Sequence, residues 1–381
     1  MRKKTWAGLA VALLVAILVV VVWIASRVDV SNGSRKTLRI GAILPLTGDI
    51  ASYGTRVKLG AEIACNELEK KELPPIEIEF QDDQDSARNA VGIMKTFCAV
   101  KHYPAVIGAA GSSVSLAIVP IANEYKVVQL SPLSSAGNLA TQGGQYFFRV
   151  CPADDQQARI LATWVAAKKY ARVAVIYTNN AWGLGLAEAF KAYYENNLHG
   201  KVALFEGTAE GQTDFRTVLT KAKAEGCKAI VSPTYPKDGG LLVRQAKELG
   251  LDCDMFGADN WGAPEFTQIA GTAAKGCFFV AQYSYDGPAF KNLNSTFKSQ
   301  TGKDADVFVA YGYDSVYAIA HAAKSAKSWQ GTDICDALRS VRFQGASGLV
   351  EFDEHGNLRT DAFVKKVIQD GKPMPLKESS K

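Results

Sequence analysis

From residue 38 onwards the chain alternates between short apolar runs and longer stretches in which apolar residues recur every three or four positions. A short apolar run bounded by Gly, Pro or polar residues predicts a buried strand, whereas the longer periodic stretch predicts a helix. Leu38–Leu44, ended by Pro45 and Gly48, is the first such run, and residues 54–71 follow with a helical period. The body of the chain therefore begins with a strand and a helix.

The same alternation continues and then restarts at residue 155. The first part predicts strands over 76–81, 104–108 and 127–131, and helices over 86–101 and 112–125. The second part predicts helices over 155–169, 183–197, 213–225 and 238–249, and strands over 172–177, 201–206, 228–232, 254–257 and 277–281. Strands that alternate with helices form parallel sheets through right-handed crossovers. We therefore predict an α/β fold of two doubly wound parallel-sheet lobes.

The last third of the chain departs from this pattern. Residues 286–342 add mostly helices, and residues 348–368 add strands. These pieces are too small to form a third domain of the usual size, so we expect them to complete the two lobes. The chain then crosses between the lobes more than once.

Composition and charge exclude several classes of protein. A chain with 48% hydrophobic and 21% charged residues has an ordinary globular composition, neither disordered nor fibrous. The formal net charge of +5 belongs to residues 1–36, which hold six Lys or Arg and one acid, so the other 345 residues sum to zero. A neutral body without a Lys/Arg run offers no electrostatic footprint for nucleic acid, and we expect no such partner.

The N-terminus carries an export signal. Arg2–Lys4 precedes an uncharged apolar run from Trp6 to Ala25, and a basic segment followed by an apolar one directs secretion. This run is also long enough to span a bilayer as a helix. We expect residues 1–36 to be a signal peptide, or an N-terminal membrane anchor, plus a linker. The body then lies in the periplasm or on the extracytoplasmic face, free or tethered.

The seven cysteines are free to pair in such a compartment. They form no CxxC and no Cys/His cluster with zinc spacing, so we expect no metal site. Cys227 and Cys253 each precede a short apolar strand in consecutive βα units. Two alternatives stay open for this pair, a disulfide between them or ordinary buried thiols.

Motifs for catalysis and cofactor binding are missing. The sequence has no GxxxxGK[ST] and no GxSxG, and Glu188 replaces the third glycine of a dinucleotide fingerprint that would begin at Gly183. The four histidines are scattered. We therefore expect no enzyme and no cofactor, and keep a doubly wound enzyme only as the rival class.

Hydroxyl residues follow two predicted strands, and ligands of open α/β sheets bind outside the carboxyl ends of the strands. Ser112 and Ser113 begin a helix whose free N–H groups suit an anion such as a carboxylate, although either serine also fits a plain helix cap. Residues 131–135, Ser-Pro-Leu-Ser-Ser, follow the next strand. These turns predict one wall of a ligand cleft.

Aromatic and acidic residues stand at equivalent places. Tyr53 and Trp182 lie in the first βα turn of each lobe, and Tyr235 lies in a later turn. Asp259 follows the strand near 254–257, where an isolated acid also fits a helix cap. Three aromatics at such positions predict an aromatic-walled cleft.

These turns lie within stretches that resemble the type I periplasmic solute-binding proteins of ABC importers, in particular the leucine/isoleucine/valine-binding branch. The likeness runs from about Leu38 to Lys372. The stretches that carry it are IGAILPLTGDIASYG at 40–54, GAEIACNEL at 60–68, VIGAAGSS at 106–113, LSPLSSAGNL at 130–139, YFFRVCPADDQQ at 146–157, YPKDGGLLVRQAKELGL at 235–251 and SGLVEFDEHGNL at 347–358.

The resemblance implies two lobes joined by three crossing segments that close on a solute. By likeness, these segments fall near 150–157, 281–286 and 346–352. The lobes then divide as follows: 37–153 and 284–347 in lobe 1, 154–283 and 348–372 in lobe 2, and 373–381 as a C-terminal tail.

The resemblance also implies a ligand site. In amino-acid binders of this family, the position of Ser112 holds the solute's α-carboxylate and α-ammonium. The backbone at the position of Leu133 and the hydroxyl at that of Ser135 share this task. The position of Asp259 takes the ammonium, beside the aromatic at that of Tyr235.

Aromatics at the positions of Tyr53 and Trp182 flank the solute's side chain in this family. The chain departs from the leucine-type pattern in having Asp259 for Glu and Trp182 for Tyr. Gly111 and the turn at 82–86 also lack the cysteines of a disulfide beside the cleft. Valine-like, polar or aromatic amino acids, or an amide, therefore stay open as ligands.

The function implied is that of a non-catalytic binding protein that captures an amino acid, with leucine, isoleucine or valine first, and delivers it to an ABC permease. The alternative is a membrane-anchored sensing domain for an amino acid or a small amide.

Overall fold

The computed structural model describes residues 36–282, 286–360 and 363–376. The predicted signal or anchor, including the apolar run from 6 to 25, lies outside these residues. Within the described ranges, no helix combines the length and the apolar character that crossing a bilayer requires.

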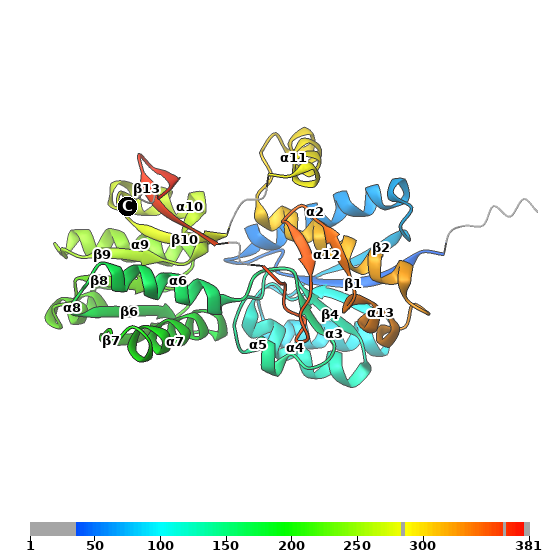
Figure 1. The fold of residues 1–381 in the computed structure, drawn as a ribbon, viewed down its shortest axis with the longest axis horizontal. Helices are drawn as coiled ribbons and strands as arrows, with labels where there is room; N and C mark the ends of the chain where they lie inside the picture. Colours follow the sequence, from blue (N-terminus) through cyan, green and yellow to red (C-terminus); the bar gives the residue numbers. More distant parts are fainter. Residues whose placement is uncertain (1–35, 283–285, 361–362, 377–381) are drawn as a thin grey trace, which may run out of the picture. The chain divides into compact units, whose positions relative to one another are not determined.

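Lobe 1 is built on a five-stranded parallel sheet with the order β2-β1-β3-β4-β5 (Figure 1). Its strands are β1 (Leu38–Leu44), β2 (Ile76–Asp82), β3 (Ala105–Gly108), β4 (Val128–Ser131) and β5 (Phe147–Arg149). The helices that connect them are α2 (Ala51–Glu67), extended by η1 (Leu68–Lys71), α3 (Ala87–Ala99), α4 (Ser112–Tyr125) and the short α5 (Leu139–Gln142). All strands but the edge strand β2 are almost fully buried, because helices cover both faces.

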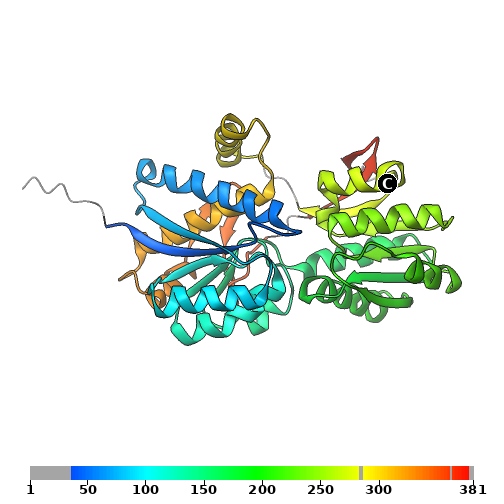
Figure 2. The same cartoon turned by 180° about the vertical axis from the view of Figure 1, so that it is seen from behind.

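Lobe 2 repeats this plan in a seven-stranded sheet ordered β14-β13-β10-β9-β8-β6-β7 (Figure 2). Its parallel strands are β6 (Val173–Thr178), β7 (Val202–Thr208), β8 (Ala229–Ser232), β9 (Asp254–Gly257) and β10 (Phe278–Gln282). Its helices are α6 (Asp154–Ala167), α7 (Ala181–Asn196), α8 (Arg216–Ala224), α9 (Pro236–Glu248) and α10 (Pro264–Ala270), with the short η2 (Asp259–Gly262) and η3 (Gly271–Ala274). The predicted α/β fold with two lobes of parallel strands is confirmed.

The segment after β10 returns to lobe 1, as the gold and orange ribbons show (Figures 1 and 2). It contains α11 (Pro288–Thr301), α12 (Val307–Ser325) and α13 (Gly331–Leu338), then the antiparallel pair β11 (Arg342–Gln344) and β12 (Leu349–Glu351). The strands β13 (Phe363–Gln369) and β14 (Lys372–Pro375) then join the edge of the lobe 2 sheet beside β10. The chain thus passes between the two sheets three times.

The last of these passages differs from the expected one. Val350, Phe352 and Leu358 pack in the same apolar core as β1 and β3, so the chain leaves lobe 1 after Leu358. We expected this boundary between 347 and 348, which is earlier in the chain than the observed one. The expectation was wrong because the pattern of apolar residues does not tell which core a short strand joins. The expected tail from 373 also contributes β14 to the sheet.

The cysteines resolve the open alternative. All seven lie within the described residues and all are free thiols, so the bridge between Cys227 and Cys253 does not form. Both side chains pack in the apolar core of lobe 2, where burial raises the pKa of the Cys253 thiol to about 12. They are ordinary buried thiols.

Lobe 1 depends on a close crossing of α2 and α12. A Cβ atom added at Gly60 would lie 2.0 Å from the carbonyl oxygen of Val309, and one at Gly312 would lie 2.0 Å from that of Val57. Only glycine permits this approach, because any side chain would separate the two backbones. The crossing holds the returning segment against the sheet.

We expect Gly312→Ala to lower the free energy of unfolding by about 1–3 kcal/mol, since the added methyl group overpacks this crossing. Gly92→Ala is the matched control, because a Cβ at this position in α3 has no atom within 4 Å. It should raise stability by about 0.5–1 kcal/mol through the higher helix propensity of alanine. Urea unfolding followed by circular dichroism measures both changes, and equal stability of the two variants would contradict the close crossing.

Candidate functional site

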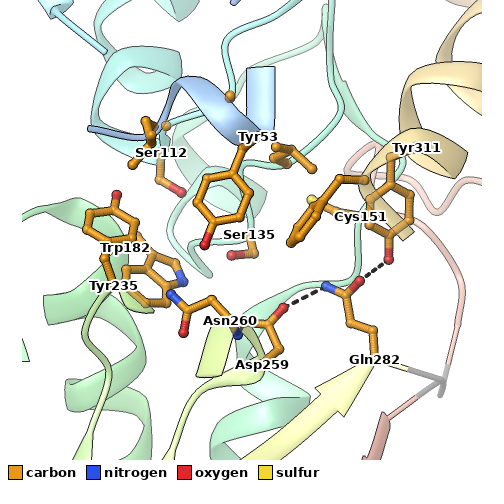
Figure 3. Close-up of a pocket in the computed structure, with 15 residues that line it drawn as sticks. Tyr53, Ser112, Ser135, Cys151, Trp182, Tyr235, Asp259, Asn260, Gln282 and Tyr311 are labelled. Carbon is orange, nitrogen blue, oxygen red and sulfur yellow. Dashed lines mark hydrogen bonds between the residues drawn. The ribbon is translucent and has the colours of Figure 1, made fainter. Parts of the chain in front are cut away.

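A cavity of about 590 Å³, part of it open to solvent, lies at the carboxyl ends of both sheets (Figure 3). All seven residues that the sequence singled out line it: Tyr53, Ser112, Leu133, Ser135, Trp182, Tyr235 and Asp259. The remaining lining residues are Ile50, Ala110, Gly111, Cys151, Asn260, Gln282, Phe308 and Tyr311. Both lobes thus contribute to one cavity.

The strand order explains why these turns meet. In each lobe the first strand along the chain, β1 or β6, lies between the second strand, β2 or β7, and the third strand, β3 or β8. The order of the strands in the sheet therefore changes direction between the first and the third strand. In sheets of this order, ligands bind outside the strand ends at that switch point. Tyr53 and Ser112 follow β1 and β3, and Trp182 and Tyr235 follow β6 and β8. The two switch points therefore line one cavity.

The N-terminus of α4 forms one polar wall. Gly111 is its N-cap residue and provides no side-chain cap, so no side chain at the cap satisfies the first-turn N–H groups. Ser112 is buried, and its Oγ accepts a hydrogen bond from the N–H of Ala136 at 3.3 Å. Its hydroxyl proton is left to donate to another group. The positive end of the helix dipole and free N–H groups favour an anion here.

The turn after β4 forms the adjoining wall. The hydroxyl of Ser131 donates to the carbonyl of Ala109 at 2.7 Å and accepts from the N–H of Ser134 at 2.9 Å. Ser134 is fully buried, and its Oγ lies 2.8 Å from that of Ser115. Ser131 and Ser134 thus hold the turn against the end of β3, whereas Ser135 lines the cavity.

Ser135 is held by an acid that the sequence analysis did not identify. Its hydroxyl donates to Oδ2 of Asp154 at 3.0 Å. Asp154 is almost fully buried in the first turn of α6, and burial together with the charge of Asp259 raises its pKa to about 8. An acid at a helix start is common because of the helix dipole, so no particular pattern in the sequence marks this residue.

Asp259 begins the short helix η2 and does not cap α10, whose N-cap residue is Ala263. Its Oδ1 accepts from the N–H of Asn260 at 2.9 Å, and its Oδ2 accepts from Nε2 of Gln282 at 2.9 Å. Burial raises its pKa to about 6, while these hydrogen bonds oppose the shift. Among the described residues, no Lys or Arg forms an ion pair with it.

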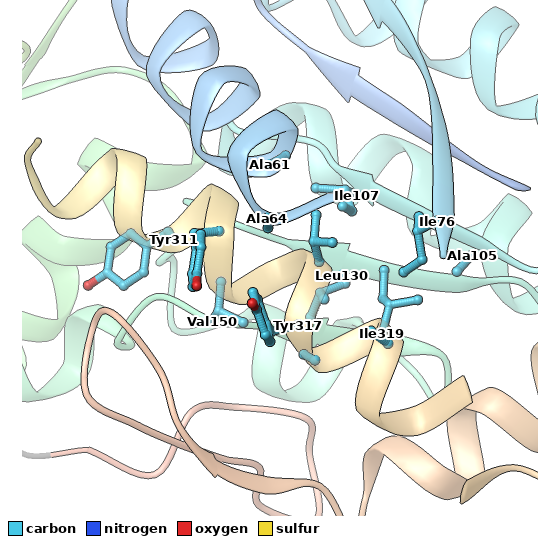
Figure 4. Close-up of a cluster of buried hydrophobic side chains, with 14 of the residues drawn as sticks. Ala61, Ala64, Ile76, Ala105, Ile107, Leu130, Val150, Tyr311, Tyr317 and Ile319 are labelled. Atoms are coloured by element: carbon cyan, nitrogen blue, oxygen red, sulfur yellow. The ribbon is translucent and has the colours of Figure 1, made fainter. Parts of the chain in front are cut away.

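Gln282 links this acid to the other lobe. Its Oε1 accepts a hydrogen bond from the hydroxyl of Tyr311 (Figure 3). Tyr311 comes from the core of lobe 1, where α12 packs against α2 (Figure 4). The rule that polar residues at strand ends point to a site would have identified Gln282, the last residue of β10. No such signal marks Tyr311, which reaches the cavity from the returning segment.

Aromatic rings form the apolar walls. Trp182 stacks on Tyr235 with ring centroids 5.1 Å apart, and Tyr53 meets Phe308 edge-on at 4.8 Å. The buried hydroxyl of Tyr53 has no hydrogen-bond partner in the described part of the chain and points toward the space between Ser135 and Asp259 (Figure 3). A buried polar atom without a partner is costly, so this position favours a ligand that supplies one.

Beside this wall, Asp85 packs directly against Gly111. A Cβ atom at Gly111 would lie 2.1 Å from Oδ1 of Asp85. Burial and the charge of Glu210 raise the pKa of Asp85 to about 7. A further contact joins the lobes nearby, because the N–H of Ala181 donates to Oγ of Ser113 at 2.9 Å.

Known proteins with similar sequences are amino-acid binders by name. A family profile described as periplasmic binding protein matches residues 37–372. The Leu/Ile/Val-binding protein homolog 3 of Brucella melitensis biotype 1 is 28% identical, over 92% of this chain and 97% of its own. The leucine-, isoleucine-, valine-, threonine- and alanine-binding protein of Pseudomonas aeruginosa is 29% identical, over 86% of this chain and 89% of its own.

Solved structures of the same kind share the fold. A leucine-binding protein, LivK, from Thermotoga maritima superposes with a TM-score of 0.81 at 29% identity, over 89% of this chain and 98% of its own. The branched-chain amino acid binding protein LivJ from Streptococcus pneumoniae, in complex with isoleucine, gives 0.79 at 28% identity and the same coverage. This chain belongs to the periplasmic binding protein family, whose members bind solutes outside the cytoplasm and are not enzymes.

Proposed function

We propose that this protein is the solute-binding component of an ABC importer, which captures leucine, isoleucine or valine between its lobes and delivers it to a membrane permease. The observation that carries the proposal is the carboxylate of Asp259, which has no cationic partner among the described residues and shares a cavity with the open N-terminus of α4. An acid and an anion-binding helix end complement the two charges of an α-amino acid. The basic and apolar segment from Arg2 to Ala25 is assigned to export.

The α-carboxylate binds at the lobe 1 wall in this proposal. The hydroxyl of Ser112 and the first-turn N–H groups of α4 donate to it, together with the backbone near Leu133. Ser135 has a different role, because its only hydroxyl proton is directed to Asp154. Its oxygen accepts, so it suits the α-ammonium, which Asp259 and the ring of Tyr235 also face.

The ligand's side chain lies against apolar groups. Tyr53, Trp182 and Phe308 are aromatic, and Ile50 and Leu133 add aliphatic surface. Such a wall favours a branched apolar side chain through the hydrophobic effect. The names of the Brucella and Pseudomonas relatives, and the isoleucine in the Streptococcus structure, support the same class of ligand.

Capture couples to movement of the lobes in this proposal. The ligand's charged groups are divided between Ser112 in lobe 1 and Asp259 in lobe 2, so they are satisfied together only when the lobes meet. A ligand that binds one conformation better shifts the population toward it. The closed, loaded form is then the one that the permease recognises.

We expect wild-type protein to bind leucine with saturable heat in calorimetry and Asp259→Asn to weaken that binding by about 2–5 kcal/mol, because the α-ammonium loses its charged partner. The keto acid 4-methyl-2-oxopentanoate lacks the ammonium, so its binding should not weaken. Asp238→Asn is the matched control, since this buried acid of lobe 2 does not line the cavity. Equal losses for leucine and the keto acid would contradict the role of Asp259, and absence of amino-acid binding to wild-type protein would contradict the function.

Binding should also depend on pH. Without ligand, Asp259 has a pKa of about 6 and Asp154 a pKa of about 8, both raised first by burial. An α-ammonium stabilises their ionised forms and lowers both pKa values, so binding releases protons. Affinity for leucine should therefore rise from pH 5 to pH 8, by up to about tenfold per pH unit for each proton released. Calorimetry in two buffers of different ionisation enthalpy counts the protons; an affinity that stays constant over this range would contradict the account.

A further inference from the structure

A tight turn over residues 353–357 docks on the end of β5, although the sequence separates Arg149 and Asn357 by 208 residues. The backbone N–H of Arg149 donates to the carbonyl of Gly356 at 2.9 Å. Gly356 has a φ of 76°, and a Cβ atom there would lie 2.1 Å from the carbonyl oxygen of Phe147. The contact is thus close enough to require glycine.

Asp353 fixes the orientation of Asn357 within this turn. Its Oδ1 accepts from the backbone N–H groups of His355 at 2.9 Å and Asn357 at 2.8 Å. Its Oδ2 accepts from Nδ2 of Asn357 at 2.9 Å. Because the amide donates to Asp353, Oδ1 of Asn357 is turned toward Arg149.

The guanidinium of Arg149 joins this turn to the serine turn of the cavity. Arg149 is fully buried, and its Nε donates to Oδ1 of Asn357 at 2.8 Å. Its Nη1 donates to the carbonyls of Ser134 at 3.2 Å and Ala136 at 2.8 Å, which flank Ser135. Among the described residues, no acid forms an ion pair with it.

A buried guanidinium without a paired acid is expensive. Its geometry has a clear consequence for the cavity. By holding the carbonyls on either side, Arg149 turns the Ser135 backbone so that its side chain reaches the cavity and Asp154. Polar groups of a binding site need such support from the residues behind them, because small displacements lose their hydrogen bonds.

We propose that Arg149 and Asn357 are positioning residues of the ligand site, which hold the serine turn in its binding conformation. This inference rests on the proposed function. Asn357 acts by fixing the guanidinium, and Arg149 acts by fixing the carbonyls around Ser135. The chain next to Arg149 leaves lobe 1, and the chain after Asn357 returns to lobe 2. The serine turn is therefore anchored where two of the three passages between the lobes begin.

The test compares three variants by calorimetry with leucine and by thermal unfolding. Asn357→Leu removes the acceptor of the Arg149 Nε at similar volume, and we expect the dissociation constant to rise at least tenfold. Asn123→Leu is the matched control, because Asn123 also ties a loop of lobe 1, through Gly143 at 2.9 Å and Gln145 at 3.0 Å. It lies outside the cavity lining, so it should lower the melting temperature without weakening binding.

The double exchange Asp353→Asn with Asn357→Asp provides the rescue. It reverses the donor and acceptor of the 2.9 Å hydrogen bond and keeps an oxygen facing Arg149, so affinity should return to within about threefold of wild type. A merely structural role of Asn357 predicts that Asn357→Leu and Asn123→Leu behave alike. If Asn357→Leu does not fold, Asn357→Ser, which is too short to reach Arg149, is measured in its place.

Wild-type affinity in folded Asn357→Leu or Asn357→Ser protein would overturn the proposal, as would an exchange variant that folds but binds as weakly as Asn357→Leu. The failure of the proposed function has a different signature, because wild-type protein and the Asn123→Leu control would then give no heat with leucine, isoleucine or valine.

Discussion

The candidate site depends on how the buried carboxylate of Asp259 is compensated for the loss of water. A charge placed between aromatic walls loses water, and that loss is costly unless hydrogen bonds and an opposite charge replace it. The protein supplies hydrogen bonds from Asn260 and Gln282 but no cation among the described residues. The pKa values of Asp259 and Asp154 are raised to about 6 and about 8, because the surrounding hydrogen bonds compensate only in part for the lost water. In the proposed function an α-ammonium meets the rest of this cost, and the cavity selects an amino acid for that reason.

The fold divides this task between two copies of one plan. The five parallel strands of each sheet follow the same order, so each lobe presents the ends of its first and third strands to the cavity. Lobe 1 provides the helix end at Ser112 and the serine turn, and lobe 2 provides Asp259 and the stacked pair of Trp182 and Tyr235. In the proposed function, lobe 1 contacts both charged groups of the ligand through Ser112 and Ser135, but the charged partner of the ammonium, Asp259, comes from lobe 2. In our proposal, buried groups behind the cavity, such as Arg149, hold the turns of the site in their binding conformation before the ligand arrives.

The sequence predicted the regular elements well, because buried parallel strands are continuous apolar runs and their helices are periodic. The helix at 112–125 has the observed bounds, whereas β5 and β11, with three residues each, were missed. Position at strand ends brought out seven of the fifteen residues that line the cavity. Tyr311 and the packing of Val350 were not predictable, since they depend on which lobe the returning segment joins, a long-range contact without a local pattern.

Small-angle X-ray scattering with and without saturating leucine tests the central claim most directly, that one ligand is held by both lobes. If Ser112 and Asp259 bind opposite ends of the same molecule, leucine should draw the lobes together, and the radius of gyration should fall in proportion to the bound fraction measured by calorimetry. Identical scattering curves for ligand-free and leucine-saturated protein would contradict the account.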